Sequence, residues 1–253
     1  MSTEKEEQVP LIKKDIPESS GFTCYLGLAA IICVVGSSFQ VGYNNALTNS
    51  PQEVLKLFIN ESYQSNYNET ISEELLTTFW AITSSAIGIG GMIGSLTAGP
   101  IINHYGSKIT LVYNNGLVLI GSALSGFAKM VGRFELMIAG RFIAGINGGI
   151  NSTIVPVYLT EISPISTRGY IGSGHQIGIG ISVVIAVVLG LKQIFGTEEL
   201  FPLMFAFSAL LAVFQLCTLP FCPESPRFLM LTRKDQEAAE KCTVLTIILL
   251  HPI

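Results

Sequence analysis

Long stretches without charged side chains divide the sequence into six apolar segments. Each stretch contains no Asp, Glu, Lys or Arg and is 19 to 34 residues long. Because a helix rises 1.5 Å per residue, about 20 residues cross the roughly 30 Å hydrocarbon core of a bilayer. The pattern therefore predicts six transmembrane helices. The uncharged stretches are residues 19–52, 75–107, 109–128, 142–160, 169–191 and 200–223.

These stretches give a three-part division of the chain. We predict a cytosolic N-terminal tail (1–21), a six-helix bundle (22–222) with an outer loop (45–77), and a cytosolic segment with a short C-terminal tail (223–253). The predicted fold class is an all-α membrane protein. The predicted helices are 22–41, 78–102, 109–128, 134–158, 170–191 and 201–221.

Composition excludes most other classes of protein. Hydrophobic residues make up 49% of the chain and charged residues 13%, with a mean hydropathy of +0.54, whereas soluble proteins carry about 25% charged residues. The sequence lacks the alternating polarity of a transmembrane β-barrel. A net charge of −4 without a basic stripe argues against nucleic-acid binding. The acidic first 21 residues lack the pattern of a cleavable signal peptide.

Lys and Arg placement predicts the orientation. With a cytosolic N-terminus, nine of these residues lie on the cytosolic side and five on the outer side, in line with the positive-inside rule. The outer loop then carries two N-glycosylation patterns, at Asn60 and Asn68. A third, at Asn151, falls inside a predicted helix, and we interpret it as a chance match. We predict a multi-pass protein of the plasma membrane with both termini in the cytosol.

The sequence offers no constellation for enzyme chemistry. None of the five cysteines lies in the outer loop, so we expect no disulfide framework. The three histidines are far apart, which leaves no metal-ligand spacing, and no nucleophile–base pair can be assembled. We predict no metal, no cofactor and no enzymatic activity.

Small residues four apart recur in the predicted helices. Gly90 and Gly94 form one such pair, Gly145 and Gly149 a second, and residues 174 and 178 a third. Such spacing lets helix backbones approach closely in lipid, so we interpret these glycines mainly as packing positions.

Polar side chains also occur at membrane depth. They include Gln40, Asn147, Asn151, His175 and Gln176. A buried amide without a partner costs about 1–3 kcal/mol, so these groups are expected to face one another or a watery cavity. Interhelical hydrogen bonding is the plainer interpretation for each residue, and a polar path is the alternative for the group.

Four short stretches resemble the sugar-porter branch of the major facilitator superfamily, specifically the animal facilitative hexose transporters. They occur in the family's order, with the expected helices between them. The stretches are GSSFQVGYN at 36–44, GRF at 140–142, EISPISTRG at 161–169 and PESPRF at 223–228.

The resemblance implies a twelve-helix protein made of two six-helix bundles, each built from two inverted three-helix repeats. A hexose such as glucose or fructose binds between the bundles near mid-membrane, and rocking exposes it to each side in turn. Nothing after Arg227 resembles the rest of the family, so we expect this chain to be the N-terminal half, ended differently from a complete transporter.

The resemblance also assigns sugar-contacting residues. Gln176 occupies the place of a family glutamine that reaches the sugar, and its carboxamide can donate to and accept from vicinal hydroxyls without net charge. Ile179 and Val183, three and seven residues on, share its helical face and match apolar positions of the family's cavity. Asn45 matches a position near the sugar on the first helix.

A gating network follows from the same resemblance. Glu161, Arg168, Glu224 and Arg227 match cytosolic charges that pair when the transporter faces outward. Glu161 and Arg168 are seven residues apart, so on a continued helix they would share a face. Residues 103–108 (NHYGSK) depart from the family's Asp-Arg-x-Gly-Arg-Arg pattern and keep one cation, Lys108, which predicts a weaker inner gate.

Proton coupling is not expected. Proton-coupled relatives carry an Asp where Asn44 stands, close to the arginine of the fourth helix, and an amide does not titrate near neutral pH. Arg141 would then be the only full charge in the outer half of the cavity. We predict uniport of the hexose.

Two alternatives remain open. The chain is either a carrier half that works with a second six-helix bundle, or a truncated, non-transporting isoform that regulates a full-length transporter. The motif EQVPLI at 7–12 fits an acidic dileucine-type sorting signal through Leu11 and Ile12, which offers endosomal or lysosomal membranes as the alternative location.

Overall fold

The computed structural model describes residues 24–164 and 166–230, and the regular structure in these ranges is entirely helical. Six helices are long and apolar enough to cross a membrane, which confirms the predicted fold class. The first span consists of α1 (Cys24–Cys33), a π-helical turn η1 (Val34–Ser38) and α2 (Phe39–Ala46). The others are α4 (Glu73–Tyr105), α5 (Ser107–Val131), α6 (Phe134–Ile162), α7 (Arg168–Leu189) and α8 (Phe201–Thr218), which continues into η2 (Leu219–Phe221).

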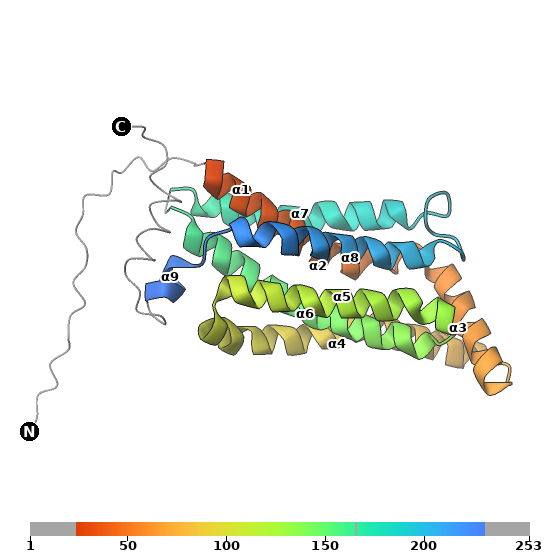
Figure 1. The fold of residues 1–253 in the computed structure, drawn as a ribbon. Coiled ribbons are helices and arrows are strands. Elements are labelled where there is room, and N and C mark those ends of the chain that lie inside the picture. The colour runs from red at the N-terminus through yellow and green to blue at the C-terminus, as the bar shows by residue number, and fades with distance from the viewer. Residues whose placement is uncertain (1–23, 165, 231–253) are drawn as a thin grey trace, which may run out of the picture.

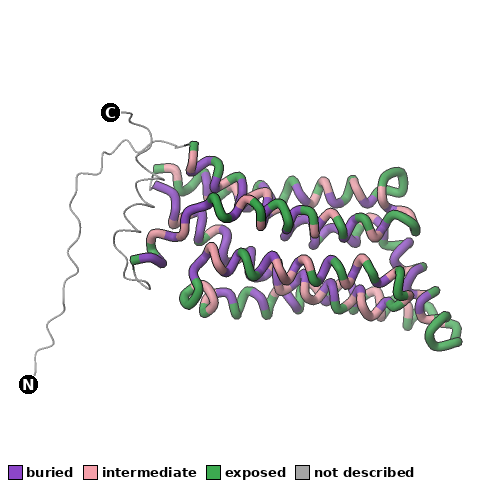
Figure 2. Tube along the Cα trace, in the orientation of Figure 1, coloured by how far each residue is buried: buried purple, intermediate pink, exposed green. Residues whose placement is uncertain are grey.

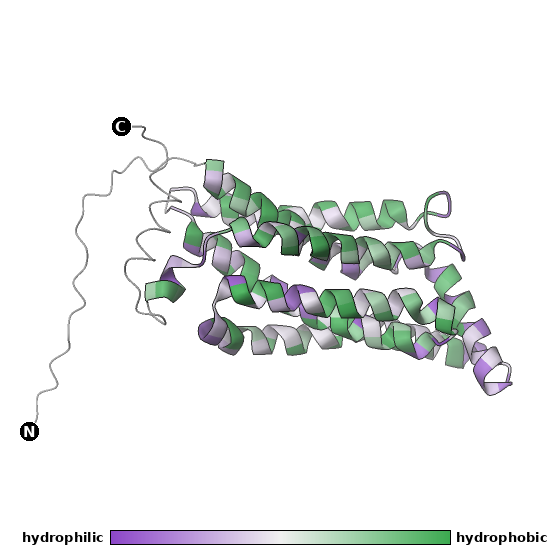
Figure 3. Cartoon of the chain, viewed as in Figure 1, coloured by the Kyte–Doolittle hydropathy of each residue, from purple (hydrophilic) through white to green (hydrophobic). Residues whose placement is uncertain are grey.

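Two short helices lie at opposite ends of this elongated bundle (Figure 1). α3 (Gln52–Tyr67) occupies one end, and α9 (Pro226–Phe228) the other, where α1 also begins. Apolar residues dominate the six long helices, and hydrophilic residues gather toward the ends (Figure 3). The N-terminal tail with its sorting motif and the segment after Met230 lie outside the described residues.

Several helices extend beyond their predicted bounds. α4 begins at Glu73 rather than residue 78 because the Ser72 hydroxyl accepts a hydrogen bond from the Leu75 amide at 3.3 Å, and Glu73 and Glu74 complement the positive end of the helix. The expected outer loop, 45–77, contains the 16-residue helix α3.

The helix contacts follow the predicted inverted repeat. α6 packs against α4 and α5, α5 also packs against α8, and α2 packs against α7. If the first and last three spans are related by a two-fold axis in the membrane plane, a contact of the second with the fourth span must recur between the fifth and the first. The α4–α6 and α2–α7 contacts are this pair. The α5–α8 contact maps onto itself.

Glycines set the distance between α4 and α6. A Cβ at Gly90, Gly94, Gly145 or Gly149 would fall within 3.0 Å of backbone atoms of the facing helix. This confirms the packing interpretation of these four residues. The crossing also makes α6 the better enclosed helix, with 56% of its span buried against 22% of α4 (Figure 2).

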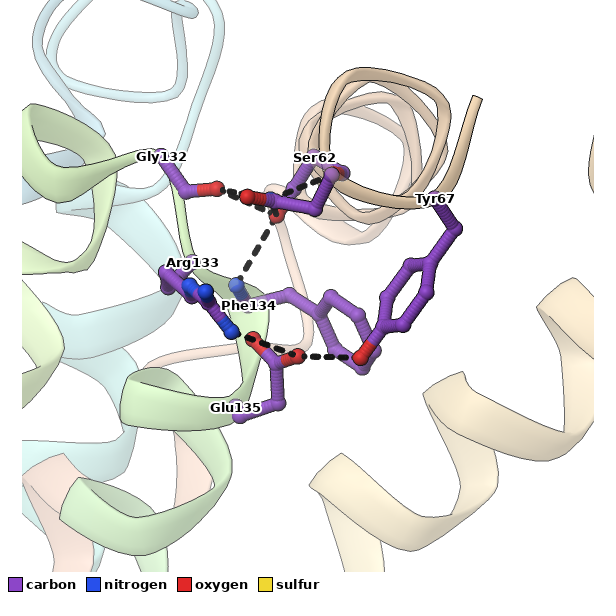
Figure 4. Close-up of polar contacts among 7 residues, drawn as sticks. Ser62, Tyr67, Gly132, Arg133, Phe134 and Glu135 are labelled. Carbon is purple, nitrogen blue, oxygen red and sulfur yellow. Dashed lines mark hydrogen bonds and ion pairs between the residues drawn. The ribbon is translucent and has the colours of Figure 1, made fainter. Parts of the chain in front are cut away.

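Hydrogen bonds fasten α3 to the turn between α5 and α6 (Figure 4). The Ser62 hydroxyl donates to the Gly132 carbonyl at 2.7 Å and accepts from the Phe134 amide at 3.0 Å. At the end of α3, the Tyr67 hydroxyl donates to Glu135 at 3.0 Å, and this bond raises the pKa of Tyr67. The outer connection is therefore a docked helix.

This docking separates the two predicted glycosylation sites. Asn68 is exposed in a left-handed conformation at the end of α3. Asn60, in contrast, lies inside the helix, and Ser62, the third residue of its glycosylation pattern, is buried by the hydrogen bonds described above. We expect Asn68 to carry most of the glycan in mammalian cells. Asn68→Gln should abolish most of the glycosidase-sensitive mobility shift on gels, while Asn60→Gln should retain it. The reverse pattern would contradict this assignment.

Candidate functional site

A layer of hydrogen-bonded polar side chains joins the helices inside the bundle. Gln40 on α2 donates to Asn115 on α5 at 3.0 Å, and Asn114 donates to Asn151 on α6 at 2.8 Å and to the Asn147 carbonyl at 3.1 Å. Each of these amides is at most 2% exposed. Gln40, Asn147 and Asn151 therefore hold neighbouring helices together through hydrogen bonds and do not line a polar path.

The π-helical turn of the first span takes part in the same layer. The Ser38 hydroxyl lies 2.7 Å from Nδ1 of His175 on α7, and Gln215 on α8 donates to the Ser37 hydroxyl at 2.5 Å. His175 is thus a packing residue, in line with the interhelical hydrogen bonding expected for each of these polar side chains. Sequence reasoning missed Asn114, Asn115 and Gln215, although each is an amide within an uncharged stretch.

Arg141 is buried inside the bundle, at 2% exposure. Its guanidinium donates to the Asn44 carbonyl at 2.7 Å and to the Thr48 hydroxyl at 3.1 Å. These bonds tie α6 to the α2 end of the first span. Arg141 lies close to Asn44, as expected, and it is buried within this bundle; its role as a cavity charge stays a prediction.

A cleft of about 320 Å³ opens between α2, α4 and α6, with mostly apolar walls and a few polar side chains. Asn44 and Asn45 line it from α2, Ser95 from α4 and Ser152 from α6. Both serine hydroxyls donate to carbonyls of their own helices, at 3.0 and 2.8 Å, so their lone pairs are free to accept. Asn45 is exposed and makes no hydrogen bond among the described residues.

Gln176 lies on an open flank of α7. Its side chain is exposed, near the middle of a 22-residue span, and makes no hydrogen bond among the described residues. Ile179 and Val183 are half-buried on the same flank of the continuous helix. Gly180, one turn beyond Gln176, has open space where a Cβ would stand, so no other described helix of the bundle covers this flank there.

The close contact of α2 with α7 determines how far Asn45 and Gln176 lie from each other along the helix axes. Gly42 lies against the Ile179 carbonyl and the Ser182 side chain. Asn45 is three residues after Gly42, and Gln176 is three before Ile179. At 1.5 Å per residue, the two amides are therefore separated by about 10 Å along the helix axes.

The charges at the α9 end form bonds within the bundle. The Glu224 carboxylate accepts from the Lys108 backbone amide at 3.0 Å, a favourable position at the N-terminus of α5. The Lys108 ammonium donates to the Pro220 and Cys222 carbonyls at 2.9 and 2.8 Å. Arg227 lies 3.7 Å from Glu161. This cluster joins α5, α6, α8 and α9.

Arg168 does not join this cluster. α6 ends at Ile162, so the continued helix on which Glu161 and Arg168 would share a face does not form, and the chain turns near Pro164 before α7 begins at Arg168. The Arg168 side chain is exposed, and no salt bridge to it occurs in ranges 24–164 and 166–230.

Comparisons with known proteins place the sequence among transporters. A family model described as "Sugar (and other) transporter" matches residues 29–245. Solute carrier family 2, facilitated glucose transporter member 5 of Equus caballus is 42% identical over 235 residues, covering 93% of this chain and 46% of the relative. Member 3 of Canis lupus familiaris is 41% identical over 219 residues, with coverages of 87% and 44%. The chain thus spans about half the length of these relatives.

Solved structures agree on the fold. The proton:xylose symporter XylE bound to 6-bromo-6-deoxy-D-glucose aligns with a TM-score of 0.75 at 23% identity, covering 88% of this chain and 50% of that one. A partially occluded inward-open structure of XylE from E. coli gives the same score at 24% identity, with coverages of 87% and 55%.

Proposed function

The chain belongs to the sugar transporter family, and from that premise we propose that it is the N-terminal half of a facilitative hexose carrier. It is a multi-pass membrane protein. A second six-helix bundle would cover the flank that carries Gln176 and Asn45, with the sugar held between the bundles. Gln176, Asn45, Ile179 and Val183 are the residues through which this half would contact it.

One observation supports this proposal most strongly. The buried amides Gln40, Asn114, Asn115, Asn147 and Asn151 all have partners inside the bundle, whereas Gln176 is exposed at mid-span without any. An amide facing lipid there would lose hydrogen bonds worth about 1–3 kcal/mol. A water-filled cleft between bundles removes that cost.

Neutral groups suit a carrier that must release its cargo. A carboxamide binds hydroxyls through ordinary hydrogen bonds, each with a net worth of about 0.5–1.5 kcal/mol, so binding stays weak enough for exit. The cluster of Lys108, Glu161, Glu224 and Arg227 would form the fixed side of the cytosolic gate, against which the second bundle closes. Arg168 would meet a partner only from outside the described residues.

We propose uniport because the group beside Arg141 does not titrate. Its guanidinium donates to the backbone carbonyl of Asn44 and to the Thr48 hydroxyl, and neither of these partners carries a carboxylate that could hold a proton. Hexose uptake by the assembled carrier should leave the pH of a weakly buffered medium unchanged. Asn44→Asp offers a matched comparison, since it restores a titratable group at the same place. Alkalinisation of the medium by the unsubstituted protein would refute uniport.

A regulatory role, in which this chain pairs with a complete transporter, is the second candidate. Uptake of labelled hexose distinguishes the two roles in cells that express this chain with either the C-terminal bundle of a relative or a complete relative. Restored uptake in the first pairing supports a carrier half. Lowered uptake in the second pairing, with none in the first, supports a regulator.

We place the protein in the plasma membrane, with α3 outside and α9 in the cytosol. The alternative is an endosomal or lysosomal membrane, directed by Leu11 and Ile12, which lie outside the described residues.

A further inference from the structure

A second cavity lies at the α9 end of the bundle, apart from the cleft that holds Asn45. It has a volume of about 280 Å³ and is bounded by α4, α6, the start of α5, and α9. Its wall contains polar and charged side chains from Asn103, Ser107, Thr153, Glu161 and Arg227, together with the aliphatic Ile102 and Val157 and the ring of Phe228. Apolar walls with a few converging polar groups are typical of small-ligand sites.

Ser107 is the first observation that points to a ligand. It is 1% exposed, and its hydroxyl has no hydrogen-bond partner among the described residues. A buried hydroxyl left unpaired costs free energy that a bound donor or acceptor would recover. The neighbouring Thr110 is also buried, but its hydroxyl is paired, since it donates to the Gly106 carbonyl at 2.6 Å.

Glu161 gives the cavity its charge. Its side chain is 17% exposed, and its nearest cation, Arg227, is 72% exposed and 3.7 Å away. That long, solvent-screened pair neutralises the carboxylate only weakly. The second carboxylate oxygen accepts from the Ser225 hydroxyl. The least solvated charge at this wall is therefore negative, which favours a cation in the cavity over an anion.

The other polar groups can accept hydrogen bonds. The Thr153 hydroxyl donates to the Gly149 carbonyl at 3.2 Å, which leaves its lone pairs available, and the Asn103 carboxamide presents an acceptor oxygen. A ligand with several N–H donors and no acceptor matches this set. Ile102 and Val157 supply an apolar surface for a short alkyl stem.

We propose that this cavity binds a guanidinium or primary ammonium group on a short alkyl chain. Glu161 is its counter-ion, Ser107 and Thr153 accept its remaining N–H groups, and the stem lies against the aliphatic wall. The site uses none of the residues assigned to the sugar and shares Glu161 with the proposed cytosolic gate, so it is tested by ligand binding to this chain and not by transport.

Thermal unfolding of the purified full chain in detergent tests the site with n-propylguanidinium as the probe. The neutral n-propylurea, of nearly the same shape, is the matched control compound. We expect a saturable rise in Tm of about 2–4 °C with the cation at ten times its dissociation constant, and no rise with the urea. Glu161→Gln should remove the response. Glu198→Gln, an exposed change at the opposite end, should preserve it.

Ser107→Arg supplies a second, covalent test, because its side chain would start at the cavity and carry its own guanidinium. This variant should unfold at a higher Tm than the unsubstituted chain without any probe, and should no longer respond to n-propylguanidinium. If Ser107→Arg does not fold, the Glu161→Gln comparison decides alone. Equal shifts with both compounds, or an unchanged response in Glu161→Gln, would overturn the proposal.

Discussion

Gly149→Val should strongly destabilise the bundle. A Cβ at this position would collide with backbone atoms of Gly91 and Ser95 on α4, and backbone cannot move aside as the end of a flexible side chain can. Overpacking of this kind costs about 1–3 kcal/mol, and a backbone clash belongs at the upper end. In a chain of this size, we expect Tm to fall by about 5–10 °C, with a matching loss of monodisperse protein in size-exclusion chromatography.

The adjacent glycine provides the control. Gly148 lies on the same helix and has nothing within 4 Å of where its Cβ would stand, so Gly148→Val makes the same chemical change without the collision. It should retain a near-native Tm. Equal losses in both variants would show that valine itself, rather than the α4–α6 approach, is harmful in α6.

Gln176→Leu should lower hexose transport about five- to thirtyfold in the carrier formed with a second bundle. The substitution nearly conserves volume but removes two N–H donors and a carbonyl acceptor. The loss of one or two hydrogen bonds to the sugar, at about 1 kcal/mol each, corresponds to roughly five- to thirtyfold. Initial rates of labelled hexose uptake, normalised to surface protein, measure the effect.

A substitution at the next residue shows whether lower transport in Gln176→Leu comes from weaker sugar binding or from poorer folding. Ile177 is 61% exposed on the same helix, and Ile177→Leu should leave uptake within about twofold of the unsubstituted protein. Both variants should show the same elution profile, because Gln176 makes no bond within the bundle whose loss would destabilise it. Unchanged transport in Gln176→Leu would remove this residue from the sugar site.

The membrane-spanning helices were predictable because each depends only on the residues within its own segment. A run of about 20 uncharged residues determines a crossing, and the small-residue pairs on α4 and α6 determine a close approach. Spacing alone did not identify the partner surface. Gly91 and Ser95 have the same spacing as Gly90 and Gly94, yet a Cβ at Gly91 would meet only ordinary contacts. That difference depends on the rotation of α4 about its own axis.

In the candidate site too, the sequence predicts which residues are present, and the packing of the helices determines what they do. Sequence located the amides, but the three-dimensional arrangement determined their roles, since Asn151 bonds to Asn114 across α5 and α6 while Gln176 on α7 stays open. The burial of Arg141 against Asn44 and Thr48 depends on how α6 crosses the first span. The helix in the loop was missed because its charged residues exclude it from the uncharged stretches, although Val54, Leu55, Phe58 and Ile59 recur at helical spacing and are buried in the core.

The most direct test asks whether the flank of α7 that carries Gln176 is wet in the assembled carrier. Gln176→Cys and Ile181→Cys place a thiol five residues apart, about 140° around the helix. In the chain paired with a second bundle, a charged methanethiosulfonate reagent should modify position 176, and hexose should slow this reaction, while position 181 reacts no faster than the unsubstituted chain. Equal protection of both thiols from the reagent, with or without sugar, would place Gln176 in lipid and contradict the carrier account.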